Sequence, residues 1–130
     1  MFLWQSKRSS KKSASVERLP VGPRSRSNLV RYGGLIFAVA TSPNKIPSLH
    51  EQTKLALDFL DTSLARVGAS KSDILQATVY IADISKKEDM NRAWDNWVDR
   101  ENAPQRACFG VALEGDDLVE IVVIAMNKSG

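Results

Sequence analysis

The chain has few of the residues that metal centres and covalent cross-links require. A single cysteine, Cys108, and a single histidine, His50, occur among its 130 residues. One cysteine excludes an intramolecular disulfide and any multi-cysteine metal site, and the lone histidine adds too little for a transition-metal centre. No apolar run approaches the roughly 18 residues that cross a bilayer. We therefore expect no metal, no cofactor and no membrane partner.

Charge is distributed unevenly along the chain. Residues 1–31 carry eight Lys or Arg and one acid, giving +7, whereas the remaining residues carry ten Lys or Arg and fourteen Asp or Glu, giving −4. The segment 5–15, QSKRSSKKSAS, is typical of a solvated flexible arm, although a mitochondrial presequence or a nucleic-acid-binding arm would be similar in composition. We favour the arm and divide the chain into a flexible arm (1–17) and one domain (18–130). We expect a cytoplasmic location, or a mitochondrial one if the arm is a presequence, and no nucleic-acid partner.

Hydrophobic periodicity predicts the order β-β-α-β-α-β-β after the arm. The first two strands, 29–32 and 35–41, read as a hairpin around a pair of glycines. The first helix begins at a capping box, 48–51, and ends at Gly68, and the second begins at a similar box, 85–88. Between them, residues 74–84 form an alternating strand. We expect three large aromatic residues in the core: Phe37, Trp94 and Trp97.

The last two strands, within residues 102–125, each carry one ionisable residue among apolar neighbours. Strand period puts Arg106, Cys108 and Gly110 on one face of the first strand. The second strand carries Glu120 among β-branched residues. Buried charges are normally paired or functional, because an unpaired one costs several kcal/mol. Spacing alone leaves a rim salt bridge about as well supported as a functional site.

We expect these two strands to form a hairpin, and its turn decides whether Glu120 shares the face of Arg106. A three-residue loop at 115–117 puts both side chains on one face, whereas a four-residue loop that includes Glu114 turns Glu120 away. The sequence alone is compatible with both loop lengths. The strands are apolar on both sides, so two helices on one face would leave the other side of the sheet uncovered. We therefore expect an α+β fold whose open sheet face is buried against another copy of the chain.

Three segments together resemble the RidA/YjgF (RutC) family: DILQATVYIADISKKEDMNRAWDNWV (73–98), APQRACFGVAL (103–113) and VEIVVIA (119–125). The resemblance covers roughly residues 18–126. It implies a chorismate-mutase-like two-layer sandwich with a mixed sheet and two helices on one face. It also implies a homotrimer with sites between subunits, and hydrolysis of reactive 2-imino acids such as 2-iminopropanoate and 2-iminobutanoate to 2-oxo acids and ammonia.

The resemblance also implies roles for individual residues. Arg106 matches the arginine that holds the substrate carboxylate, a task that suits a planar guanidinium. Glu120 matches the acid that orients or activates water. Cys108 matches a cysteine of the pocket wall, and Asn91 a polar residue near the cleft, although an ordinary solvated helix position is an equal alternative for Asn91.

Two departures separate the chain from the family pattern. Arg24 stands where the family has a pocket tyrosine, and Val39-Ala40 replaces a Ser-Gly or Thr-Gly pair. Each lost hydrogen bond is worth on the order of 1 kcal/mol. Two functions therefore stay open: an imine deaminase, or a non-catalytic small-carboxylate-binding or scaffolding member of the family.

Overall fold

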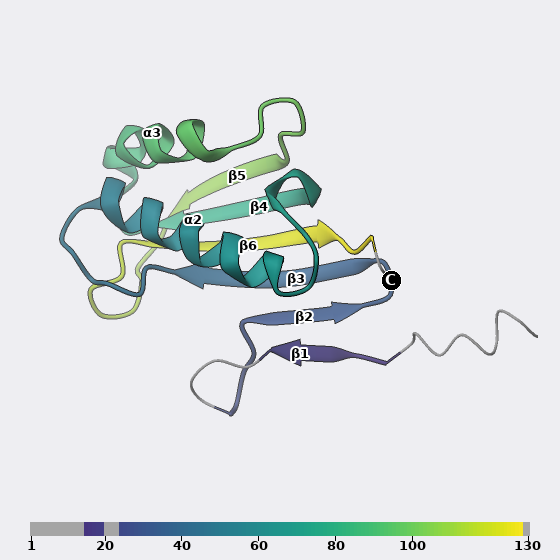
Figure 1. The fold of residues 1–130 in the computed structure, drawn as a ribbon. Coiled ribbons are helices and arrows are strands. Elements are labelled where there is room, and N and C mark those ends of the chain that lie inside the picture. The colour runs from purple at the N-terminus through teal and green to yellow at the C-terminus, as the bar shows by residue number, and fades with distance from the viewer. Residues whose placement is uncertain (1–14, 20–23, 129–130) are drawn as a thin grey trace, which may run out of the picture.

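The computed structural model describes residues 15–19 and 24–128, so most of the basic arm lies outside the described residues (Figure 1). The strands are β1 (Glu17–Leu19), β2 (Leu29–Tyr32), β3 (Leu35–Thr41), β4 (Ile74–Ile81), β5 (Gln105–Gly110) and β6 (Val119–Met126). The helices are α2 (Leu49–Ala65), α3 (Lys87–Trp97) and the short 3-10 helices η1 (Lys71–Asp73) and η2 (Ile84–Lys86). Strand β1, which begins at the last residue of the predicted arm, was not predicted from the sequence. Among the described residues, no helix has the length and apolar character to cross a membrane.

The six strands form one mixed sheet in the order β1-β2-β3-β6-β4-β5. All neighbouring pairs are antiparallel except β4 and β5, which are parallel and joined through α3. Both α-helices lie on one face of this sheet (Figure 1). The predicted α+β fold, with a mixed sheet and two helices on one side, is confirmed.

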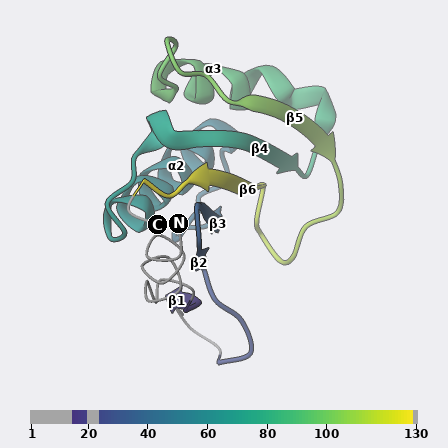
Figure 2. The same cartoon turned by 90° about the vertical axis from the view of Figure 1, so that its right-hand side faces the viewer.

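The prediction that β5 and β6 form a hairpin is wrong. β4 lies between them and pairs with both, in parallel with β5 and antiparallel with β6. Figure 2 shows the long loop that leads from β5 to β6. Because the two strands are not neighbours, neither of the two loop lengths considered above sets the direction of the Glu120 side chain. That direction follows from pairing with β3 and β4.

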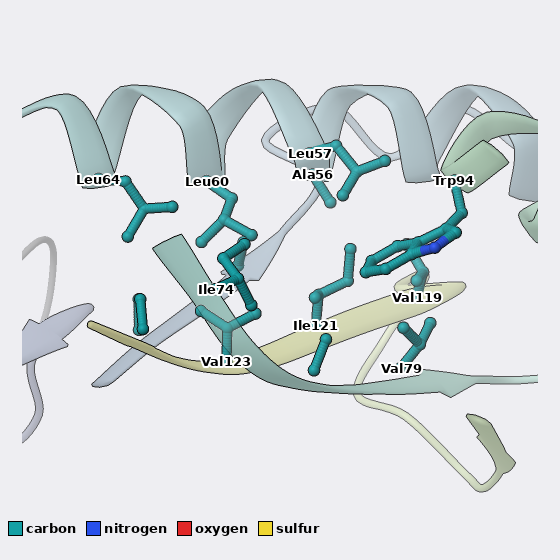
Figure 3. Packing of buried hydrophobic residues seen from close by; sticks show 14 of the residues in the cluster. Ala56, Leu57, Leu60, Leu64, Ile74, Val79, Trp94, Val119, Ile121 and Val123 are labelled. Carbon is teal, nitrogen blue, oxygen red and sulfur yellow. The ribbon is translucent and has the colours of Figure 1, made fainter. Parts of the chain in front are cut away.

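The core lies between the helices and the inward-facing residues of the central strands. Period-2 alternation buries every second residue of β6, from Val119 to Ala125, and the same pattern holds in β3 and, after an irregularity between Ile74 and Gln76, in β4 from Ala77 to Ile81. Figure 3 shows side chains from the two helices meeting those of the strands: Ala56, Leu57, Leu60, Leu64, Ile74, Val79, Trp94, Val119, Ile121 and Val123. The expectation of a core position holds for Trp94, and half-buried Trp97 packs against the same core.

The other side of the sheet, called the open face here, carries exposed hydrophobic side chains. These are Tyr32, Leu35, Phe37, Phe109, Val122 and Met126. Phe37 is 41% exposed, so its predicted core position is wrong. Its neighbours Ile36 and Ala38 point toward the helices, and strand alternation therefore turns Phe37 away from them.

The helix boundaries confirm only the serine half of the first predicted capping box, because the Ser48 N–H donates to the carbonyl oxygen of Ile46 at 2.8 Å and not to Glu51. The Ser48 hydroxyl accepts a hydrogen bond from the Glu51 N–H at 3.1 Å, and Gly68 follows α2 at a φ of +76° that favours glycine. The predicted box at Ser85 is wrong. Ser85 lies inside η2, and its N–H and hydroxyl both donate to the Asp83 carboxylate, at 3.0 and 2.7 Å. Asp83 caps this turn instead, because its carboxylate accepts both bonds.

The buried side chain of Gln52 fixes the segment that leads into β6. Its amide nitrogen donates to the carbonyl oxygens of Ile46 at 2.9 Å and Asp116 at 3.0 Å. Its amide oxygen accepts from the N–H of Leu118 at 2.9 Å. Helix α2 thereby holds the loop before β6 at a point two residues before Glu120.

Candidate functional site

Arg106 lies on the helix side of β5 and is held by an aromatic ring and a sulfur atom. It pairs in parallel register with Ala77, which is buried beneath the helices, so both side chains point to that layer. The guanidinium carbon lies 5.3 Å from the centroid of the Trp94 ring, and Nη1 lies 3.8 Å from Sδ of Met90. The cation–π contact between Arg106 and Trp94 is worth about 0.5–2 kcal/mol. Within the described residues Arg106 makes no ion pair, which leaves its fork of N–H groups for a ligand.

Cys108 lies on the same side of β5 as Arg106, as strand period predicted. It pairs with buried Val79 and packs against the core. Burial raises the pKa of the Cys108 thiol above its ordinary value, and the charges of Lys87 and Arg106 offset only part of this effect. The thiol therefore stays protonated at neutral pH, as suits a wall residue rather than a nucleophile.

Gly110, the third residue of this face, brings β5 close to η2. A Cβ atom added at Gly110 would lie 2.7 Å from Cβ of Ile84, closer than packed side chains approach each other. Only glycine fits this approach, so its presence in the cluster reflects backbone packing.

Asn91 carries an unsatisfied polar atom next to the residues that hold Arg106. It follows Met90 on α3 and precedes Trp94 by three positions, which places it one helical turn from the ring under the guanidinium. Its amide nitrogen donates to Glu88 at 2.9 Å, but its buried Oδ1 has no partner within the described residues. An unsatisfied buried acceptor costs about 1–3 kcal/mol, so a donor from a ligand or a second chain would be favourable here.

Glu120 lies on the open face, away from Arg106. It pairs with Tyr80 on one side and Thr41 on the other, and all three are half-buried. A hollow of about 250 Å³ surrounds the carboxylate. Its lining residues are Arg26, Ser27, Asn28, Val39, Thr41, Glu114, Asp117 and Glu120.

The structure thus places two of the four predicted site residues on one face and separates a third from them. Arg106 and Cys108 lie on the helix side of β5, and Asn91 follows Met90, the α3 residue that Arg106 contacts, while Glu120 lies on the opposite face of the sheet. No alternative loop length could have revealed this, because β4 separates the two strands. Within one chain, Arg106 and Glu120 do not act on the same molecule.

The two departures from the family pattern affect the Glu120 hollow unequally. Val39 lines it with an apolar side chain, whereas Ala40 is buried on the helix side. Arg24 is exposed and is not part of the lining, but Arg26, two residues later, is. Sequence analysis missed Arg26 and Thr41. Thr41 follows Val39 by two positions, so strand period could have placed both on one face.

Metal ligands do not gather in this structure. Over the described ranges 15–19 and 24–128, no group of three or more His, Cys, Asp or Glu side chains is arranged to hold a metal ion.

Comparison with known proteins agrees with the fold. The family model described as endoribonuclease L-PSP matches residues 25–127. A RutC family protein of Haemophilus influenzae is 37% identical over 100 residues, covering 76% of this chain and 83% of that protein. A protein of Escherichia coli named putative reactive intermediate deaminase TdcF is 28% identical over 130 residues, covering 92% and 99%.

A solved structure of a related protein has a similar fold. A member of the YjgF protein family from Neisseria meningitidis superposes with a TM-score of 0.84 at 31% identity, covering 91% of this chain and 99% of that one. The family model spans most of the described domain, including β5 and β6 with their two ionisable residues. The chain therefore belongs to the RidA/YjgF (RutC) family.

Proposed function

We propose that this protein hydrolyses reactive 2-imino acids to 2-oxo acids and ammonia, at sites shared between copies of the chain. The observation that carries the proposal is Arg106, a half-buried guanidinium that is stacked on Trp94 and makes no ion pair within the described residues. Such a group is suited to grip both oxygens of a small carboxylate. The similarity to a protein named putative reactive intermediate deaminase supports the same reaction.

The separation of Arg106 from Glu120 is the reason for proposing shared sites. The open face carries Glu120 together with a set of exposed hydrophobic side chains, and a patch of this kind is normally covered by a partner. A second copy seated on this face could bring its β5–α3 edge, with Arg106 and Asn91, to the first copy's Glu120. We propose a homotrimer, in which each chain contributes its arginine to one site and its glutamate to the next.

The proposed reaction needs no redox change. Arg106 holds the substrate carboxylate and so fixes the position of the neighbouring C=N carbon. Glu120 takes a proton from water as the water oxygen bonds to that carbon and passes it to the nitrogen, giving a carbinolamine. The hydroxyl proton of the carbinolamine then moves to the nitrogen through Glu120 as the C–N bond breaks, so that ammonia leaves and the C=O of the 2-oxo acid forms. Because imines are electrophilic and hydrolyse spontaneously, the protein need supply only a modest rate gain.

A coupled assay tests the proposal. An amino acid oxidase or dehydratase generates 2-iminopropanoate, and ammonia release is followed with wild type, Arg106→Ala and Arg92→Ala. Arg92 is the matched control because it is an exposed arginine of α3 paired with Asp89. We expect acceleration by wild type and by Arg92→Ala, and loss of that acceleration in Arg106→Ala. A wild-type rate equal to the uncatalysed background would refute deamination of these substrates.

One observation favours a second function, the binding of small carboxylates without catalysis. Val39 presents an apolar side chain to the Glu120 hollow, where the family pattern has a hydroxyl that could hold water. Binding of 2-oxobutanoate to wild type, lost in Arg106→Ala, combined with no acceleration of imine hydrolysis, would establish this alternative.

A further inference from the structure

The hollow around Glu120 contains a cation that the proposed reaction does not use. Arg26 lies in the segment before β2 and is exposed. Its only hydrogen bond within the described residues is a 3.5 Å contact with the hydroxyl of its neighbour Ser25. Three carboxylates line the same hollow, yet none lies within ion-pair distance of the Arg26 guanidinium. Its N–H donors are therefore accessible to a ligand.

The charges around Arg26 are partly compensated by the fold. The Asp117 carboxylate pairs with Lys45 and is only 15% exposed, so its charge is already neutralised. Glu120 has a role in the proposed reaction. Glu114, exposed in the loop after β5, is the remaining carboxylate of the lining. Within the described residues, the hollow therefore offers a ligand one cation, Arg26, and two carboxylates without an ion-pair partner, Glu114 and Glu120.

Neutral polar side chains on the lining can add hydrogen bonds to a carboxylate that Arg26 holds. The side chains of Ser27, Asn28 and Thr41 line the hollow, and none makes a hydrogen bond within the described residues. Each carries an N–H or O–H group that can donate a hydrogen bond to a carboxylate oxygen. Because these hydroxyl and amide groups also accept hydrogen bonds, the donor-only guanidinium of Arg26 is the part of the lining that favours a carboxylate over an ammonium or guanidinium group.

We propose that Arg26 binds a second anionic group of the ligand, so that this protein prefers 2-imino and 2-oxo acids whose side chain ends in a carboxylate. The inference rests on the proposed function, in which Arg106 of a neighbouring copy holds the carboxylate next to the reacting carbon. Arg26 would thus bind a second carboxylate, at the other end of the substrate.

The test compares the binding of three 2-oxo acids by titration calorimetry: 2-oxobutanoate, 2-oxoglutarate, and the guanidino acid 2-oxo-5-guanidinopentanoate. Wild type should bind 2-oxoglutarate about tenfold or more tightly than 2-oxobutanoate, since a charged hydrogen bond is worth enough for that ratio. Arg26→Gln should bring the ratio close to one. Arg66→Gln, which changes an exposed arginine at the end of α2 outside the hollow, should keep it. Unchanged circular dichroism of Arg26→Gln would show that the fold is intact.

The outcomes separate this inference from the proposed function. Equal wild-type affinity for 2-oxobutanoate and 2-oxoglutarate would overturn the role of Arg26, whatever the protein catalyses. Tighter binding of the guanidino acid would also overturn it and would assign recognition to Glu114. A preference for 2-oxoglutarate that depends on Arg26, with no acceleration of imine hydrolysis, would uphold the role of Arg26 and refute the deaminase. Failure of wild type to bind any of the three would refute both.

Discussion

Replacing Arg106 with lysine tests whether two-point geometry or charge alone makes this residue important. Arg→Lys keeps one positive charge but replaces a planar fork of N–H groups with a single ammonium. The guanidinium carbon lies 5.3 Å from the centroid of the Trp94 ring, so the charged group lies over an aromatic face. A lysine can contact the ring but cannot present two parallel donors to a carboxylate.

The expected cost follows from the lost hydrogen bond. A hydrogen bond to a charged group is worth about 1.5–3 kcal/mol, and Arg106→Lys removes one of the two that a bidentate contact makes. That loss corresponds to a dissociation constant for 2-oxobutanoate that rises roughly ten- to hundredfold. The site is half-buried, so bulk solvent screens the loss only in part.

Titration calorimetry with 2-oxobutanoate measures this cost directly. Arg92→Lys, on the exposed side of α3, is the control and should bind as wild type does. A thermal unfolding scan of Arg106→Lys separates weakened binding from weakened folding. Equal affinity in wild type and Arg106→Lys would contradict the clamp and would make Arg106 a structural residue that packs on Trp94.

Four further predictions concern catalysis, assembly, stability and thiol reactivity. Glu120→Gln should lower turnover of 2-iminopropanoate about tenfold or more while changing 2-oxobutanoate affinity less, because its contribution arises in the transition state; equal losses in both would contradict this role. Wild type should sediment at about three times the 14.4 kDa chain mass, and Phe37→Glu on the open face should shift it toward the monomer; a monomeric wild type at micromolar concentration would refute the trimer. Gln52→Ala removes three buried hydrogen bonds and should lower the free energy of unfolding by about 3 kcal/mol in urea titrations, whereas a loss below about 1 kcal/mol would mean that the loop rearranges. Because burial raises the pKa of Cys108, iodoacetamide should alkylate it more slowly than free cysteine at pH 8, and the folded state should lose stability as pH rises through this raised pKa; labelling as fast as free cysteine would contradict the burial.

Local patterns were enough to predict most of the elements. Alternation of apolar residues predicted β4 and β6, and helical spacing predicted α2 and α3, because each of these elements buries one face in the core. The short β1 was missed because three residues carry no readable period. The prediction that Ser85 caps a helix was wrong because the nearby Asp83 carboxylate accepts from the backbone N–H instead. Which side chain caps a turn depends on the exact backbone geometry.

Strand partners could not be predicted from the same patterns. β5 and β6 are consecutive and both apolar, which favours a hairpin, but β5 instead pairs with β4 through the connection that contains α3. That choice is made by contacts between distant parts of the chain. It also decided the candidate site, since the face of Glu120 follows from its neighbours Tyr80 and Thr41 rather than from the preceding loop.

The placement of Arg106 and Glu120 on opposite faces of one sheet has a genetic consequence. If every working site takes its arginine from one copy and its glutamate from another, two inactive alleles can rescue each other. Chains carrying Arg106→Ala have an intact Glu120, and chains carrying Glu120→Ala have an intact Arg106. Random mixing of the two in equal amounts would give about a quarter of the sites both wild-type residues, whereas neither allele alone gives any. Co-expression should therefore restore activity that no amount of either single mutant supplies.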